Sequence, residues 1–230
     1  MEILSYNQLM FNFLLKILDF VYKKKCYFCG SSYYNSVMCE KCYDKIEELS
    51  LGSILTIQDV KVYSCTFYAK EMQKLIRGVK YHNQKELAVF QAKFMYDYFK
   101  KIIEKNTDFV IIPVPMHKNK YKQRKYNHME LVAEELAVIS GWKVKTDLII
   151  RVKETKPQYK LKMKERIENL AGAFKVLPEN YKGENLLIID DILTTGSTLT
   201  EMIKELNANG IKKITCLTSS SVHGASVNIQ

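Results

Sequence analysis

Two adjacent carboxylates stand at the end of a short apolar run in the segment LLIIDDILTTGSTLTEM. Residues 186–189 form the run, and Asp190 and Asp191 follow it directly. A short continuous apolar run is typical of a strand that is buried on both faces of a parallel sheet. The two acids would then lie at the carboxyl edge of the sheet, where open α/β proteins bind their ligands. Carboxylates accept strong hydrogen bonds from hydroxyl groups, so this pair suits a ligand that carries a ribose diol.

The loop after the acids has little side-chain bulk and many hydroxyl groups. It consists of Thr194, Thr195, Gly196, Ser197 and Thr198. A helix is expected to follow through Leu199, Ile203 and Leu206, and backbone N–H groups at a helix start can surround a phosphate. The motifs of a P-loop and of a dinucleotide fingerprint are both missing. An ordinary strand–loop–helix corner is the alternative, although two uncompensated acids would be costly there.

Four cysteines form two C-x-x-C pairs near the start of the chain: Cys26, Cys29, Cys39 and Cys42. Four thiolates at this spacing suit tetrahedral Zn²⁺, and four protein ligands leave no open position for catalysis. Disulfides and an iron–sulfur cluster are the alternatives, and a reducing compartment disfavours the first. Cys65 and Cys216 fall in expected strands and are predicted to be inert core thiols.

The elements that would position these groups alternate between strand and helix. Strands are expected at 60–69, 108–115, 145–152, 186–190 and 212–220, and helices at 72–79, 86–103, 127–139 and 199–206. This order predicts an α/β fold, a parallel sheet flanked by helices. We expect two domains: an N-terminal helix with the zinc-binding module at 1–55, and the α/β domain at 56–230.

Composition and charge narrow the class of protein. The 230 residues are 47% hydrophobic, which is enough for a packed core, and the net charge of +10 favours polyanionic partners. The apolar run at 10–21 is interrupted by Lys16 and Asp19, so it suits neither a signal peptide nor a membrane span. An amphipathic helix packing on the body is expected, with attachment to a membrane surface as the alternative. The sequence predicts a cytoplasmic protein without an integral membrane segment.

The segment quoted above resembles the 5-phosphoribosyl-1-pyrophosphate (PRPP) motif of type I phosphoribosyltransferases. The apolar run, the paired acids and the T-T-G-S-T loop all coincide with it. The resemblance implies that Asp190 and Asp191 hold the ribose hydroxyls and that residues 194–198 hold the 5′-phosphate. It also implies that Mg²⁺ bridges the pyrophosphate and ribose oxygens.

The chain beyond residue 20 resembles the ComF family (ComFC, or GntX-like) of competence-associated proteins. Three features carry this resemblance: the four-cysteine module, the segment RKYNHMELVAEELA at 124–137, and the segment TKPQYKLKMKERIENLAGAFKV at 155–176. The second is similar to the family's R-G-F-N-Q segment, from which Lys125 and His128 depart. On the third, the matching residues are Thr155, Gln158, Leu161, Arg166, Asn169, Gly172, Ala173 and Phe174.

Two basic segments flank the expected site. Residues 118–125 and 151–166 hold twelve cations and two acids. In a phosphoribosyltransferase fold the first segment would receive pyrophosphate, and the second is similar to a mobile flap. The candidates for these contacts are Lys118, Arg124, Gln158 and Arg166. Solvated charged loops are the alternative. Interleaved Tyr121, Tyr126 and Tyr159 favour stacking with single-stranded DNA.

Two classes of function follow. The first is a binding protein that holds PRPP and Mg²⁺ and acts in DNA uptake or natural transformation, binding single-stranded DNA. The alternative is an active phosphoribosyltransferase with an unidentified acceptor. No catalytic residue is identified, because Thr194 stands where enzymes of the hypoxanthine–guanine class place an acid. Docking to a competence helicase through the zinc module is a third hypothesis.

Overall fold

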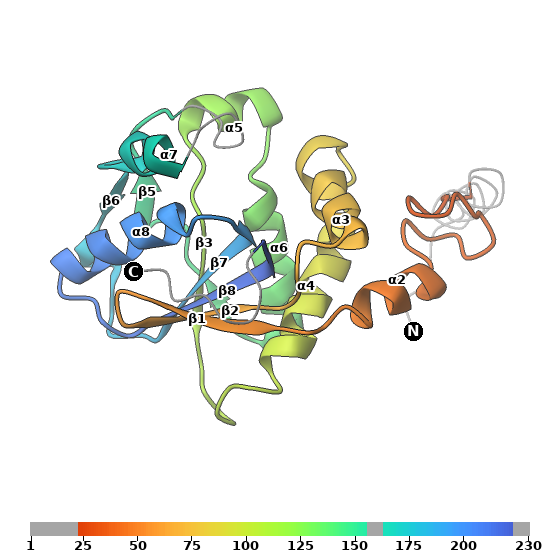
Figure 1. Cartoon of the computed structure of the whole chain (residues 1–230), viewed down its shortest axis with the longest axis horizontal. Coiled ribbons are helices and arrows are strands. Elements are labelled where there is room, and N and C mark those ends of the chain that lie inside the picture. Colours follow the sequence, from red (N-terminus) through yellow and green to blue (C-terminus); the bar gives the residue numbers. More distant parts are fainter. Residues whose placement is uncertain (1–22, 156–162, 223–230) are drawn as a thin grey trace, which may run out of the picture. The chain divides into compact units, whose positions relative to one another are not determined.

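The computed structural model describes residues 23–155 and 163–222, and the chain divides into two compact units, Met1–Asp44 and Lys45–Gln230 (Figure 1). The expected amphipathic helix near the N-terminus lies outside the described residues. Within the described ranges, no helix has the length and apolarity needed to cross a membrane. The four cysteines lie in the smaller unit; Cys39 directly precedes helix α2 (Glu40–Glu47), and Cys42 lies in its first turn.

The larger unit contains a six-stranded sheet in the order β1-β2-β8-β7-β3-β4. Its strands are β1 (Ser53–Ile57), β2 (Val60–Ser64), β3 (Val110–Pro113), β4 (Lys143–Val144), β7 (Leu186–Leu193) and β8 (Ile214–Ser221). Neighbouring strands from β2 to β4 are parallel, and only the edge strand β1 runs antiparallel to its neighbour. The predicted α/β class is therefore confirmed, with a mixed sheet that is mostly parallel.

Helices cover both faces of this sheet. Helices α3 (Lys70–Tyr81), α4 (Leu87–Phe99) and α6 (His128–Ser140) gather on one side, and α8 (Ser197–Ala208) lies on the other (Figure 1). Helix α7 (Met163–Leu170) contacts α8 on that side, and a 3₁₀ turn η2 (Pro178–Asn180) follows strand β6 (Phe174–Val176) in the chain. Strand β7 is central, and its first four residues are fully buried. This burial explains the continuous apolar run in the sequence.

Strand β1 was not predicted. It pairs with β2 through a two-residue turn in which Gln58 and Asp59 both have positive φ angles, 49° and 63°. Such a turn suits the twist of a hairpin, but it is usually made by Asn-Gly or Asp-Gly. Residues 53–57 (SILTI) include three β-branched side chains, which favour a strand, but because Gln-Asp does not carry the turn signal, the hairpin and its strand β1 were missed.

Two further expectations were wrong. The segment at 145–152 does not join the main sheet: β5 (Ile149–Arg151) pairs antiparallel with β6 (Phe174–Val176) in a separate two-stranded sheet. The basic stretch after β3, where no helix was expected, contains helix α5 (Lys118–Arg124). His117 caps this helix, since its ring nitrogen accepts a hydrogen bond from the backbone N–H of Asn119.

Candidate functional site

The two acids of β7 point to opposite faces of the sheet, because side chains alternate along a strand. Asp190 shares the face of Leu186 and Ile188, which pack in the core below α8. Asp191 projects to the other face, where it meets α3 and α6. The two carboxylates therefore lie on opposite faces of the sheet, near the carboxyl ends of its parallel strands.

A cavity of about 570 Å³ lies at this edge. Both acids and five cationic side chains line it: Arg77, Lys80, Lys120, Arg124 and Arg151. Further lining comes from the apolar or aromatic side chains of Tyr68, Ile76, Tyr81, Met116 and Met129. Because the cations outnumber the carboxylates, the cavity suits a ligand that carries several negative charges.

Asp191 is held by two neighbours from different helices. Its Oδ2 accepts a hydrogen bond from the ammonium of Lys80 on α3 and lies 3.1 Å from Nε2 of His128 on α6. Burial alone would raise the pKa of Asp191, but the charge of Lys80 and the bond from His128 hold this pKa below its usual range. Burial and the charge of Lys80 lower the pKa of His128, so the imidazole is neutral at pH 7.

Asp190 has a different environment. Its Oδ1 accepts a hydrogen bond of 2.8 Å from the backbone N–H of Asp191. Burial and the negative charge of Asp191 raise the pKa of Asp190 to about 8. Arg151 on β5 is a nearby cation; its Nη2 donates to Thr155, whereas its buried Nε has no partner in the described part of the chain.

The hydroxyl-rich loop after β7, residues 194–198, lines both this cavity and a second, smaller hollow. Thr194 and Thr198 line both, while Gly196 and Ser197 line only the smaller hollow. Gly196 has a φ of +74°, a conformation that favours glycine, and it precedes the first residue of α8. The hydroxyl of Thr195 lies 2.7 Å from that of Ser197, which fixes the turn. Backbone N–H groups at a helix start attract anions, so this loop suits a phosphate.

A buried asparagine holds the segment before α6 in place. The side chain of Asn127 accepts a bond from the N–H of Met129 and donates to the carbonyl of Val114, at 3.1 and 3.0 Å. It thereby caps α6 and ties its start to the end of β3. As a result His128, the first residue of α6, lies against the cavity.

Of the residues expected to contact pyrophosphate or to belong to the flap, the structure places only some at the cavity. Arg124 lines the cavity, with its guanidinium 4.8 Å from the ring centre of Tyr81. Lys118 is exposed and is absent from the cavity wall, where Lys120 stands instead. Burial and the nearby charges of Arg151, Arg124 and Lys80 lower the pKa of Lys120. Gln158 lies outside the described residues, and of Arg166 only the backbone, on α7, is described.

Four cavity cations were not named as site candidates from the sequence: Arg77, Lys80, Lys120 and Arg151, of which the last two fall inside the basic segments 118–125 and 151–166. Arg77 and Lys80 lie near the end of α3, far from the acids in the chain. Cations on an amphipathic helix usually face solvent, so their spacing held no signal. Lys120 falls inside the basic segment that was singled out, and only the helical geometry of α5 distinguishes it from Lys118.

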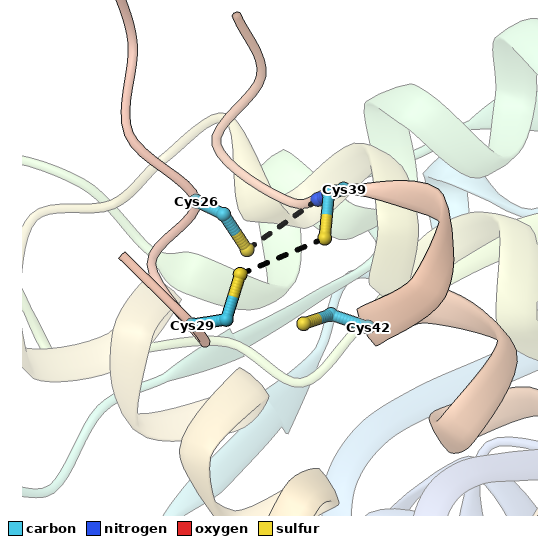
Figure 2. A group of neighbouring side chains, drawn as sticks. All are labelled: Cys26, Cys29, Cys39 and Cys42. Atoms are coloured by element: carbon cyan, nitrogen blue, oxygen red, sulfur yellow. Dashed lines mark hydrogen bonds between the residues drawn. The ribbon is translucent and has the colours of Figure 1, made fainter. Parts of the chain in front are cut away.

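The four cysteines of the smaller unit face one another (Figure 2). Their Sγ atoms all lie within 4.8 Å, and those of Cys29 and Cys39 are 3.8 Å apart. Zn–S bonds of about 2.3 Å in a tetrahedron place two sulfurs about 3.8 Å apart. The N–H of Cys39 also donates to Sγ of Cys26 at 3.4 Å. Distances and donor set both fit a tetrahedral metal site.

The pKa values of these thiols differ from one another. Backbone N–H groups lower the pKa of Cys26 to about 6 against the effect of burial. Burial raises the pKa of Cys39 and Cys42. Four thiolates cannot share this space without a metal ion to compensate their charge. The residues therefore fit Zn²⁺.

The chain is similar to phosphoribosyltransferase domains and to competence proteins. Residues 129–226 match the family model of the phosphoribosyl transferase domain. The chain is 30% identical over 152 residues to competence protein F of Haemophilus influenzae, covering 64% of this chain and 66% of that protein. It is 28% identical over 175 residues to competence protein ComFC of Bacillus subtilis, covering 76% and 68%. It is 25% identical over 195 residues to the DNA utilization protein YhgH of Escherichia coli K12, covering 82% and 80%.

Proposed function

Because this chain belongs to the ComF family of competence proteins with a phosphoribosyltransferase domain, we propose that it binds PRPP with Mg²⁺ and acts in DNA uptake. In this proposal it works in the cytoplasm and also binds single-stranded DNA. The observation that carries the PRPP assignment is the cavity at the carboxyl edge of β7, where five cations surround an acidic pair beside a phosphate-type loop.

The chemistry of PRPP matches this distribution of groups. The ligand carries a 5′-phosphate, a ribose diol and a pyrophosphate. The loop at 194–198 offers N–H and hydroxyl donors for the phosphate, the acid pair offers acceptors for the diol, and the cations offer charge for the pyrophosphate. Carboxylate oxygens are also ligands that Mg²⁺ accepts. When bound, Mg²⁺ would neutralise part of the pyrophosphate charge.

Thermal unfolding with PRPP and Mg²⁺ tests the proposal. A ligand that binds only the native state raises the melting temperature by mass action, so the wild type should show a dose-dependent rise. Asp190→Asn combined with Asp191→Asn should abolish it, because amides replace the carboxyl groups that accept from the diol, and a hydrogen bond to a charged group is worth about 1.5–3 kcal/mol. Asp108→Asn combined with Asp147→Asn, at two exposed acids outside the cavity, is the matched control. A wild type that shows no rise contradicts the proposal.

The exposed surface of helix α5 supports the proposed binding of single-stranded DNA. Helix α5 exposes Lys118, Tyr121 and Lys122, and Lys125 follows it, also exposed. Cations with an exposed aromatic ring suit single strands, whose bases stack on aromatic side chains. Tyr126 is less suitable than expected, because its hydroxyl donates to the carbonyl of Val79 and Lys85 lies over its ring. Tyr159 lies outside the described residues.

The alternative function is the transfer of phosphoribose from PRPP to an acceptor in the same cavity. If the protein transfers phosphoribose to an acceptor, PRPP turnover releases pyrophosphate when that acceptor is present. Incubation with PRPP, Mg²⁺ and single nucleobases, followed by a pyrophosphate assay, distinguishes transfer from binding alone. A zinc-dependent contact with a competence helicase is tested separately by pull-down with Cys39→Ser as the control.

A further inference from the structure

We infer that the cysteine module, residues 23–44 of the smaller unit, carries a second surface for single-stranded DNA, separate from helix α5. This surface, the module surface, consists of the lysine segment 23–25 and the tyrosine turn 33–35. The inference rests on the proposed binding of single-stranded DNA and deepens it, because it adds a binding surface outside the phosphoribosyltransferase domain.

The two segments of the module surface lie side by side. The backbone N–H of Lys24 donates to Oδ1 of Asn35 at 2.7 Å, although eleven positions separate the two residues in the chain. The N–H of Cys26 donates to the carbonyl of Ser31 at 2.8 Å, which closes the loop between the segments. The lysines and the tyrosines therefore belong to one continuous region of the module.

Tyr33 offers an aromatic ring to solvent. The residue is 84% exposed, and its ring centre lies 5.0 Å from that of Tyr34 in an edge-to-face arrangement. The backbone N–H of Tyr33 donates to Oγ of Ser31 at 3.2 Å, which supports the turn. A base of a single strand can stack on such a ring, whereas the bases of a duplex are already paired and stacked.

The charge of the module surface suits phosphate groups. Lys23, Lys24 and Lys25 are all exposed, and residues 23–39 include no acid. An exposed ammonium beside a DNA strand neutralises a phosphate and releases a counterion. Adjacent cations next to an exposed aromatic ring are the combination with which proteins bind single strands without a sequence preference.

The same charge could meet an anionic membrane, but the neighbouring side chains favour DNA. Helices and loops that lie in a lipid interface bury apolar side chains such as leucine, phenylalanine and tryptophan. Within residues 23–44, the exposed large hydrophobic residues are Tyr33 and Tyr34, and both carry a polar hydroxyl. The described module therefore offers rings for stacking and lacks exposed aliphatic side chains for insertion into lipid.

Filter binding with the full chain and two DNA probes tests the stacking contact. The probes are an oligothymidine strand and a duplex of the same length. Tyr33→Ala should weaken binding of the single strand about fivefold or more and leave the duplex within about twofold, because only unpaired bases stack on the ring. Tyr33→Phe is the matched control and should retain the affinity for the single strand, because the ring remains. Zinc content equal to that of the wild type verifies that the module is folded.

A pair of double variants tests the phosphate contacts. Lys24→Gln with Lys25→Gln should weaken binding of the single strand and reduce its salt slope by about 0.7 for each phosphate contact that is lost. Lys101→Gln with Lys105→Gln removes the same charge at two exposed lysines outside α5 and the cavity, and should leave the affinity within about twofold. PRPP should raise the melting temperature of all these variants as it does in the wild type.

The possible failures differ in what they contradict. If Tyr33→Ala leaves the affinity for the single strand unchanged while Lys118→Glu with Lys122→Glu lowers it, the inference is wrong and the proposed function stands. If Lys24→Gln with Lys25→Gln retains DNA binding but loses binding to phosphatidylserine vesicles, the surface meets a membrane and the inference is again wrong. A wild type that does not bind single-stranded DNA contradicts the DNA part of the proposed function itself.

Discussion

His128 Nε2 lies 3.1 Å from Oδ2 of Asp191, although 63 positions separate the two residues in the chain. Asn127 makes this contact possible, because it caps α6 and holds the start of the helix against the end of β3. His128 also departs from the family's R-G-F-N-Q segment, which has glutamine at this position. An imidazole Nε2–H and a glutamine amide can each donate to a carboxylate, so the departure preserves the contact.

We predict that His128→Gln retains most of the stability and that His128→Leu loses about 1–3 kcal/mol. Leucine leaves the buried carboxylate of Asp191 with one partner fewer, and an unsatisfied buried acceptor has a cost of that size. Urea unfolding at pH 7 measures the free energies of unfolding. Equal losses for both variants would show that the packing of the ring, rather than its hydrogen bond, matters.

The pH dependence of stability should reveal Asp190. Its pKa is raised to about 8 in the folded protein, whereas an unfolded aspartate titrates near its usual value of about 3.9. Between these values the folded state binds a proton that the unfolded state lacks. This contribution to stability is full below the lower pKa and is lost as the pH rises through about 8.

Asp190→Asn should therefore raise the melting temperature at pH 9 relative to the wild type, and the difference should shrink toward pH 5. Scanning calorimetry in the absence of ligand measures it. Asp147→Asn, at an exposed acid, serves as the control and should give no such trend. A constant difference at all pH values would mean that Asp190 is ionised throughout.

Lys125→Gly should stabilise the protein by about 0.5–1 kcal/mol. Lys125 follows α5 with a φ of +66°, and this left-handed conformation favours glycine, which the family usually has here. Chemical denaturation compares it with Lys122→Gly, which lies inside α5 at an exposed position. That control should instead lose up to about 1 kcal/mol, because glycine is unfavourable within a helix.

Binding of single-stranded DNA should depend on α5. Lys118→Glu with Lys122→Glu should weaken binding for all sequences alike and reduce the salt slope by about 0.7 for each DNA phosphate that the variant no longer neutralises. PRPP binding should be retained, because neither lysine lines the cavity. Fluorescence anisotropy at several salt concentrations measures the effect.

The matched control for DNA binding is Lys212→Glu with Lys213→Glu. These two exposed lysines precede β8 and so lie at the opposite edge of the parallel strands. The change in net charge is identical, so a general loss of positive charge would weaken binding equally in both pairs. Equal weakening would contradict a DNA site on α5.

The purified protein should contain about one Zn²⁺ per chain. Cys39→Ser should lose the metal and destabilise the cysteine module, because a structural zinc supplies much of the folding free energy of so small a unit. Elemental analysis and limited proteolysis check this. Cys65→Ser, at a buried cysteine outside the cluster, should retain zinc. Iron in place of zinc would contradict the assignment.

The local arrangement of the candidate groups could be predicted from the sequence alone. The run at 186–189, the two acids and the hydroxyl-rich loop occupy consecutive positions, so strand period and helix-start geometry determine where they lie. The two C-x-x-C pairs are local in the same sense, and their clustering is confirmed. The alternation of strands and helices was sufficient to predict the α/β class.

Only the tertiary structure decided which distant cations join the acids. Lys80 and His128 contact Asp191 because α3 and α6 cover the same face of the sheet. Arg151 lies on the Asp190 side, on strand β5, which pairs with β6 in a separate sheet. No short-range spacing specifies such contacts. They arise when helices pack on a twisted sheet and bring the side chain of a lysine next to a buried acid.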